Sequence, residues 1–207
     1  MKIFCIAEAF ILVFALLLAV LRSLPGPVFF PVRALAIAYA DFFRGVPTIL
    51  VIALLGFGAP ALAIEGVPTS TTFWGVVSLV LIYTAYVSEV YRAGIESVHP
   101  SQEAAARSLG LTRGQALSSV VLPQAVRRVI PPLLNDFIGL QKDTALVGIL
   151  GSVEAFKQAQ IEVSADFNFT HYLVAATLFV AITIPLARLT DWLVARDRRR
   201  RLAGALT

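Results

Sequence analysis

The sequence predicts an all-α integral membrane protein with about five transmembrane helices, its N-terminus outside and its C-terminus in the cytoplasm. Three observations support this class. Hydrophobic residues make up 58% of the 207 residues, and the mean hydropathy is +0.82. Charged residues make up only 14%, whereas soluble domains have about 25%. The charged residues also gather between long apolar segments.

Five segments are long and apolar enough to cross a membrane, because each has close to the ~20 residues that a spanning helix needs. They lie at about 3–21, 46–64, 73–90, 129–150 and 169–189. The first has an embedded Glu8 and no small-residue cleavage site before Arg22, so we interpret it as a retained span and not as a signal peptide. The whole chain, 1–207, is then one transmembrane domain.

The arginines set the predicted orientation. They fall in the first loop (22–45), in the third loop (91–128) and around the tail (190–207), and cytoplasmic loops are the ones enriched in basic residues. Most of the charged residues in the second and fourth loops (65–72 and 151–168) are acidic. We interpret the tail as a cytoplasmic topology anchor that also meets anionic lipid headgroups. It lacks the aromatic interleaving of a nucleic-acid-binding segment, so no nucleic acid is expected as a partner.

The third loop begins with a predicted short helix. Ser101 is the candidate N-cap, and Glu103 lies in the first turn near the positive end of the helix dipole. Residues 103–109 have high helix propensity. Gly110 follows as a C-cap would, because glycine tolerates a positive φ angle. This segment is therefore expected to present one exposed helix to a groove on a partner protein.

A second short helix is predicted at 112–121, and Pro123 is expected to break it. Pro131 and Pro132 come soon afterwards, inside the fourth apolar segment. Prolines within membrane helices are tolerated as kinks where neighbouring groups satisfy the freed carbonyls. We expect these prolines to form a kinked connector that transmits movement of the loop to the fourth span.

The third loop resembles the cytoplasmic EAA motif of the membrane subunits of bacterial ABC importers. That motif reads EAA, three residues, Gly, nine residues and Ile-x-Leu-Pro; here Gly110 is followed by nine residues and then by Val-Val-Leu-Pro at 120–123. Flanking segments resemble the polar amino acid permeases of the histidine, glutamine and arginine type. They are DFFRGVPTIL (41–50), AYVSEVYRAGIESV (85–98), LPQAVRRVIPPLLND (122–136) and KDTAL (142–146).

The resemblance assigns an ATPase-coupling role to eight residues of the loop. They are Gln102, Glu103, Ala104, Ala105, Ala106, Gly110, Leu122 and Pro123. The glutamate of the motif falls on Ala104, and Glu103 lies one residue earlier, about 100° around a helix. The ion pair that this glutamate would form with an ATPase is therefore displaced or absent in this chain.

The resemblance implies a type I ABC importer permease core and a permease subunit that moves polar amino acids, or relatives such as opines, across the bacterial inner membrane. It also implies two cytoplasmic ABC ATPase subunits, a second permease subunit (the same or paralogous) and a periplasmic solute-binding protein. The chain contains no G-x-x-x-x-G-K-[ST] segment. ATP and Mg²⁺ are therefore expected on a partner chain, with no cofactor and no catalytic residue here.

Two alternative functions stay open. The same machinery could serve another small solute, such as an osmolyte, a phosphonate or a metal chelate. From a different class, the chain could be an ATP-independent channel or a membrane scaffold.

A candidate translocation path lies at the end of the fourth span. It comprises Asn135, Gly139, Lys142, Asp143 and Thr144. Positions 135, 139 and 142–143 fall on one helical face, and charged groups inside a bilayer are expected to face the bundle interior or a wet path. The alternative is a structural Lys–Asp network near the outer interface.

The remaining polar residues have structural explanations. Glu89 precedes Arg92 by three residues and is expected to pair with it. His99 and His171 are isolated, and Cys5 is the only cysteine, so neither a metal site nor an internal disulfide is expected.

Overall fold

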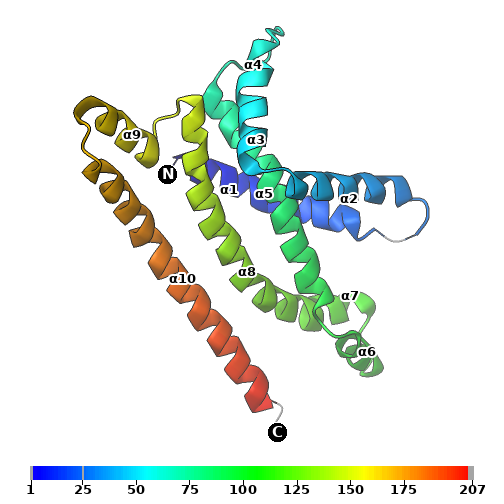
Figure 1. Cartoon of the computed structure of the whole chain (residues 1–207). Helices are drawn as coiled ribbons and strands as arrows, with labels where there is room; N and C mark the ends of the chain where they lie inside the picture. Colours follow the sequence, from blue (N-terminus) through cyan, green and yellow to red (C-terminus); the bar gives the residue numbers. More distant parts are fainter. Residues whose placement is uncertain (1, 25, 205–207) are drawn as a thin grey trace.

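All regular secondary structure in residues 2–24 and 26–204, which are the residues described by the computed structural model, is helical, and no strand occurs among them (Figure 1). The elements in chain order are α1 (Lys2–Arg22), α2 (Phe30–Gly45), α3 (Thr48–Ala53), the π-helical turn η1 (Leu54–Gly58), α4 (Ala59–Ala61), α5 (Thr71–Glu96), α6 (Pro100–Ser108), α7 (Arg113–Ala116), the π-helical turn η2 (Leu117–Val121), α8 (Leu122–Asp143), the 3-10 helix η3 (Thr144–Leu150), α9 (Ala155–Asp166) and α10 (Thr170–Gly204).

Three helices in the described part of the chain are long and apolar enough to cross a membrane by themselves. They are Lys2–Arg22, Thr71–Glu96 and the segment Thr170–Asp197 of α10. These helices coincide with the predicted spans at 3–21, 73–90 and 169–189, so the first, third and fifth predicted apolar helices are confirmed.

The segment predicted as a span at 46–64 does not form a helix that crosses a membrane by itself. Helices α3 and α4, with η1 between them, cover only 14 residues, about 20 Å at the α-helical rise, which is less than the ~30 Å hydrocarbon core. The segment combines with α2, which falls in the predicted loop 22–45, as a pair bent by 102°. Pro47 causes the break: it has no N–H, and Val46 before it is extended (φ −96°, ψ 132°).

Helix α8 differs from the predicted fourth span (129–150). The helix starts at Leu122, stays helical through Pro131 and Pro132, and tightens into η3 after Asp143. Its charged residues keep it outside the group of helices that qualify as spans by length and composition. It nevertheless packs between α5 and α10 (Figure 1). Its passage across the membrane stays a prediction.

Helix α5 is the centre of the fold. Half of its apolar window is buried inside the protein, compared with 11% for α10. It packs on α1, α2 and α8 around fully buried side chains such as Ile11, Leu79 and Leu140. A Cβ at Gly94 would overlap the Val129 side chain, so this glycine permits the close approach of α5 and α8.

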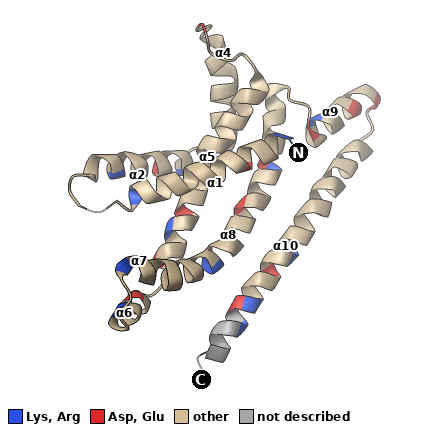
Figure 2. Cartoon of the chain, turned by 180° about the vertical axis from the view of Figure 1, so that it is seen from behind, with Lys and Arg blue, Asp and Glu red and all other residues tan. Residues whose placement is uncertain are grey.

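The two ends of the molecule are formed by different elements. Helices α6 and α7 and the C-terminal part of α10 lie at one end, and α4 and α9 lie at the other (Figures 1 and 2). The predicted tail at 190–207 is a continuation of α10 as far as Gly204. Residues 205–207 lie outside the described residues.

Candidate functional site

Helix α6 presents the predicted coupling residues at the end of α5. It begins at Pro100, and its N-cap is His99, whose Nδ1 accepts the backbone N–H of Ser101 at 3.2 Å. The predicted cap, Ser101, is therefore wrong by two residues: proline fills the first helical position, where its missing N–H costs nothing, and this displaces the cap to the preceding residue. Glu103 lies in the first turn, as predicted.

The helix ends at Ser108, and Gly110 follows with φ +91°. This left-handed conformation confirms the predicted stop at Gly110. Thr112 then caps α7 through a capping box with Gln115, whose side-chain oxygen accepts the backbone N–H of Thr112 at 2.9 Å. The chain therefore reverses within a few residues and brings α6 against η2.

Pro123 does not break the second helix, contrary to our prediction. Helix α7, η2 and α8 follow one another without a gap, and the backbone N–H of Leu122 bonds to the carbonyl of Leu117, five residues earlier. The wider π turn accommodates a ring that would otherwise clash with a carbonyl of the preceding turn. The second half of the loop, from α7 onward, and α8 are consequently one continuous helical body.

The coupling residues divide into a buried and an exposed set. Ala106 is buried, whereas Ala104, Ala105, Leu122 and Pro123 are exposed. Gln102 is also exposed, and its Oε1 accepts the Gln124 side chain at 3.3 Å. Leu109 is 82% exposed at the end of α6. The exposed surface of α6 therefore combines small residues with Gln102 and Arg107, and Leu109 follows directly after the helix.

Glu103 has one charged neighbour in the described chain. Its Oε1 lies 3.7 Å from Nε of Arg113, and the side chains are 36% and 84% exposed respectively. An exposed pair at this distance contributes about 0–1 kcal/mol. The Glu103 carboxylate is therefore free to meet a partner at little cost.

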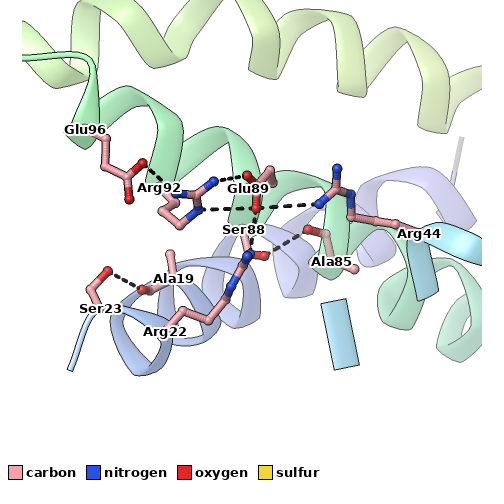
Figure 3. A network of polar contacts seen from close by, with 9 residues as sticks. All are labelled: Ala19, Arg22, Ser23, Arg44, Ala85, Ser88, Glu89, Arg92 and Glu96. Carbon is pink, nitrogen blue, oxygen red and sulfur yellow. Dashed lines mark hydrogen bonds and ion pairs between the residues drawn. The ribbon is translucent and has the colours of Figure 1, made fainter. Parts of the chain in front are cut away.

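Glu89 lies in a denser cluster on α5 (Figure 3). Its Oε2 is 2.8 Å from Nη1 of Arg22 and 3.6 Å from Nη1 of Arg44, and its Oε1 pairs with Arg92. Arg92 also contacts Glu96 at 2.5 Å. The predicted Glu89–Arg92 pair is confirmed, and it is joined by arginines from α1 and α2.

Sequence reasoning missed the roles of Arg22 and Arg44 in this cluster. Arg22 is only 9% exposed, and Arg44 precedes the break between α2 and α3. The sequence held one indication of these roles: each of the two arginines lies at the end of an apolar segment, on the side of the membrane predicted for Glu89. One carboxylate thus ties together α1, the bend after α2 and α5.

The predicted path residues are brought together in part. The Tyr83 hydroxyl of α5 donates to Asp143 at 3.0 Å, and a Cβ at Gly139 would lie 3.1 Å from the same hydroxyl. Asn135 and Lys142 are exposed. Thr144 donates back to the carbonyl of Gln141 at 2.7 Å. Asp143 thus bonds to tyrosine and not to the lysine of the predicted Lys–Asp network.

Two polar groups near this face lie outside the predicted set of path residues. Gln141 is buried, and its Oε1 accepts the Thr183 hydroxyl of α10 at 3.1 Å. Oδ2 of Asp136 is buried and has no hydrogen-bond partner among the described residues. Helical periodicity pointed to positions 135 and 139 and gave no reason to select these neighbours.

His171 pairs with Asp166 in the turn between α9 and α10. The two side chains are 2.9 Å apart, and the hydrogen bond from His171, together with one from the backbone N–H of Asn168, lowers the pKa of Asp166 below its ordinary range. Within 2–24 and 26–204, no group of three or more His, Cys, Asp or Glu side chains is placed to hold a metal ion.

Comparison with known proteins matches residues 11–201 to the family model described as "binding-protein-dependent transport system inner membrane component". A probable glutamine ABC transporter permease protein, GlnM, of Bacillus subtilis (strain 168) is 36% identical over 77% of this chain and 73% of its own length. A probable amino-acid ABC transporter permease protein, PatM, of Vibrio harveyi is 35% identical over 90% and 83%.

Solved structures agree with this match. An amino acid ABC transporter crystallised with histidines has a TM-score of 0.83 and 30% identity, covering 94% of this chain and 89% of that one. The methionine transporter MetNI shares the fold, with a TM-score of 0.71 and 18% identity over 94% and 91%. This chain belongs to the family of binding-protein-dependent transport system inner membrane components.

Proposed function

We propose that this chain is the permease subunit of an ATP-driven importer of polar amino acids, or of opine-like relatives, in the bacterial inner membrane. The single observation that carries the proposal is the exposed α6 surface, ended by Gly110 and packed on the η2 turn that continues into α8, in a chain of this family. Named relatives that act on glutamine or amino acids support the class of solute.

Family membership implies ATPase and solute-binding-protein partners in general. We propose two cytoplasmic ATPase subunits, which would supply ATP and Mg²⁺, and a second permease subunit. This chain contains no P-loop sequence of its own. Its contribution is therefore mechanical: it binds the ATPase on one side and opens or closes a solute path.

The orientation that we propose places α6, α7 and the end of α10 in the cytoplasm. The arginines gathered at this end support it. Single cysteines at Ser108 on α6 and Ser164 on α9, both exposed, test it in a Cys5→Ser background. A membrane-impermeant maleimide should label position 164 in intact cells whose outer membrane is permeable, and position 108 only in inverted vesicles. The opposite pattern would reverse the orientation.

Movement of α6 would reach the membrane through two contacts. Helix α6 packs on η2, which continues into α8. Arg128 of α8 also donates to the carbonyl and hydroxyl of Ser97 at the end of α5. Displacement of α6 by an ATPase would therefore shift α8 against α5, where Tyr83 meets Asp143. We propose that Asn135, Gly139, Lys142, Asp143 and Thr144 line the path that this shift opens.

Reconstitution tests the proposal. The transporter assembled with its ATPase and binding protein should accumulate a polar amino acid in proteoliposomes when ATP is present. Ala105→Arg, which places a bulky charge on the exposed face of α6, should abolish both ATPase association and uptake. Uptake without ATP, or unchanged association in Ala105→Arg, would contradict the proposed role of α6.

A further inference from the structure

A cleft of about 720 Å³ lies between α5, α8 and the C-terminal part of α10. These parts of the helices lie at the end of the molecule that also holds α6 (Figure 1). Much of the cleft wall is apolar, with Val90 and Ala93 on α5, Pro131 on α8 and Val194 on α10, and its acidic residues are Glu89 and Asp197. Arg127 and Arg128 also line it. An apolar floor beside two guanidinium groups suits an amphiphilic anion.

The arginines of the cleft are not neutralised by its acidic residues. Glu89 is already paired with three other arginines, and Asp197 is engaged within the chain. Arg128 is oriented by its hydrogen bonds to Ser97. Arg127 is exposed and has no ion pair or hydrogen bond with any residue that the structure describes. The cleft therefore keeps positive charge available for a ligand.

The length of α10 puts this cleft at the level of lipid headgroups. From Thr170 to Asp197 the helix has 28 residues, about 40 Å, which exceeds the ~30 Å hydrocarbon core. Near the same end, the Arg196 guanidinium lies 5.0 Å from the ring of Trp192. Tryptophan is enriched at membrane interfaces. Val194 and Asp197 therefore lie beyond the hydrocarbon.

We propose that this cleft binds one anionic phospholipid of the cytoplasmic leaflet. The phosphate would lie between Arg127 and Arg128, and the glycerol and upper acyl carbons would lie on Val90, Pro131 and Val194. Basic pockets between membrane helices on the cytoplasmic side bind anionic headgroups in this way. The assignment of this lipid to the cytoplasmic leaflet depends on the orientation proposed above, whereas the binding of a lipid in the cleft does not.

The site differs from the proposed solute path. Arg127 and Asp143 are 16 residues apart on α8, about 24 Å along a helix. A lipid in the cleft would contact α5, α8 and α10 together, at the point where Arg128 joins the end of α5. A bound lipid would therefore restrain the relative movement of the helices to which movement of α6 is transmitted.

Native mass spectrometry of the assembled transporter tests the proposal, after delipidation and titration with phosphatidylglycerol or phosphatidylcholine. One phosphatidylglycerol should be retained per permease chain, in preference to phosphatidylcholine. Arg127→Gln should weaken its retention about fivefold, the change expected for one basic residue near an anionic surface. Ala93→Phe, which fills the floor at an exposed position, should abolish it.

Arg199→Gln is the matched control, because it removes the same charge from an exposed position on α10 that does not line the cleft. It should keep the bound lipid. Equal losses in Arg127→Gln and Arg199→Gln would overturn the site in favour of diffuse attraction to the tail. Displacement of the lipid by inorganic phosphate or by an amino acid would also overturn it. Arg127 is exposed and makes no hydrogen bond or ion pair with the described residues, so its replacement should leave the fold intact.

Discussion

Glu89 and Glu103 lie on either side of the turn at His99, and they have opposite surroundings. Glu89 is 24% exposed and meets arginines from α1, α2 and α5. Glu103 is 36% exposed and has one arginine at 3.7 Å, which is itself 84% exposed. Both residues fall within a segment that resembles a transporter motif, yet only Glu89 has the partners of a structural residue. The carboxylate of Glu103 is available to another protein.

The difference follows from where each helix places its carboxylate. Helix α5 is packed on several sides, so a charge on it is desolvated and needs opposite charges nearby. Helix α6 has one buried residue in the whole element, Ala106. A charge on α6 stays in water and needs no partner.

The largest effect is expected from Glu89→Gln. This change leaves Arg22, Arg44 and Arg92 close together without their shared carboxylate, and should lower the free energy of unfolding by about 3 kcal/mol. Denaturant titration of the purified protein in micelles measures it. Glu96→Gln is the control, because Glu96 is 61% exposed and, among the described residues, pairs only with Arg92; it should cost less than about 1 kcal/mol. Equal losses in the free energy of unfolding for Glu89→Gln and Glu96→Gln would contradict the distinction between structural and available carboxylates.

Leu109→Asp should have the next largest effect, on association and not on stability. Leu109 is 82% exposed, so the protein itself should unfold normally, whereas a buried contact with the ATPase would lose an apolar anchor and gain an unpaired charge. We expect affinity for the ATPase to fall at least about tenfold, measured by surface plasmon resonance. Ser164→Asp adds the same charge on α9 at the other end and should leave this affinity unchanged. Unaltered binding in Leu109→Asp would move the contact surface away from α6.

Glu103→Gln should change little. Its exposed pair with Arg113 is worth less than about 1 kcal/mol, and we expect ATP-dependent uptake to fall by less than threefold. Uptake in proteoliposomes measures this. A tenfold loss would instead show that the displaced carboxylate replaces the motif glutamate, and Glu103→Gln/Ala104→Glu should then recover uptake.

The smallest effect concerns Asp166, a carboxylate outside the bundle. Its pKa is lowered by hydrogen bonds in the folded state, so the ionised form stabilises the fold at pH values above the ordinary aspartate range, and this contribution is lost as the pH falls through the lowered folded-state pKa. The wild-type protein should melt slightly above Asp166→Asn at pH 7. The difference should shrink as the pH falls below the ordinary value of 3.8 and vanish once the pH is below the lowered folded-state pKa. A difference that persists there would indicate a role beyond ionisation.

The sequence was sufficient for the long apolar helices and for the stop at Gly110, because hydropathy and glycine conformation are local properties. It was insufficient at Pro47 and Pro123. Both prolines lie close to helical residues, but one separates two helices bent by 102° and the other lies in a continuous helix. The extended residue before Pro47 and the π turn before Pro123 determine the difference, and both depend on packing around them.

The candidate site was also predictable only in part. Spacing located the α6 surface and the pair Glu89–Arg92. The additional partners Arg22, Arg44 and Tyr83 come from other helices. A single sequence shows which residues are charged, but it does not show which distant helices deliver them to one point.

The π turn at Leu117–Val121 has a consequence for the permitted length of the chain. A π turn includes one residue more than an α-helical turn, and each helical residue adds about 100° of rotation. The wider turn therefore absorbs one residue without rotating the helix that follows it. Deleting one residue within η2 would let the turn become α-helical and would leave α8 in its present orientation, with Asp143 still facing Tyr83, whereas inserting a further residue would exceed what the π turn absorbs and would rotate α8.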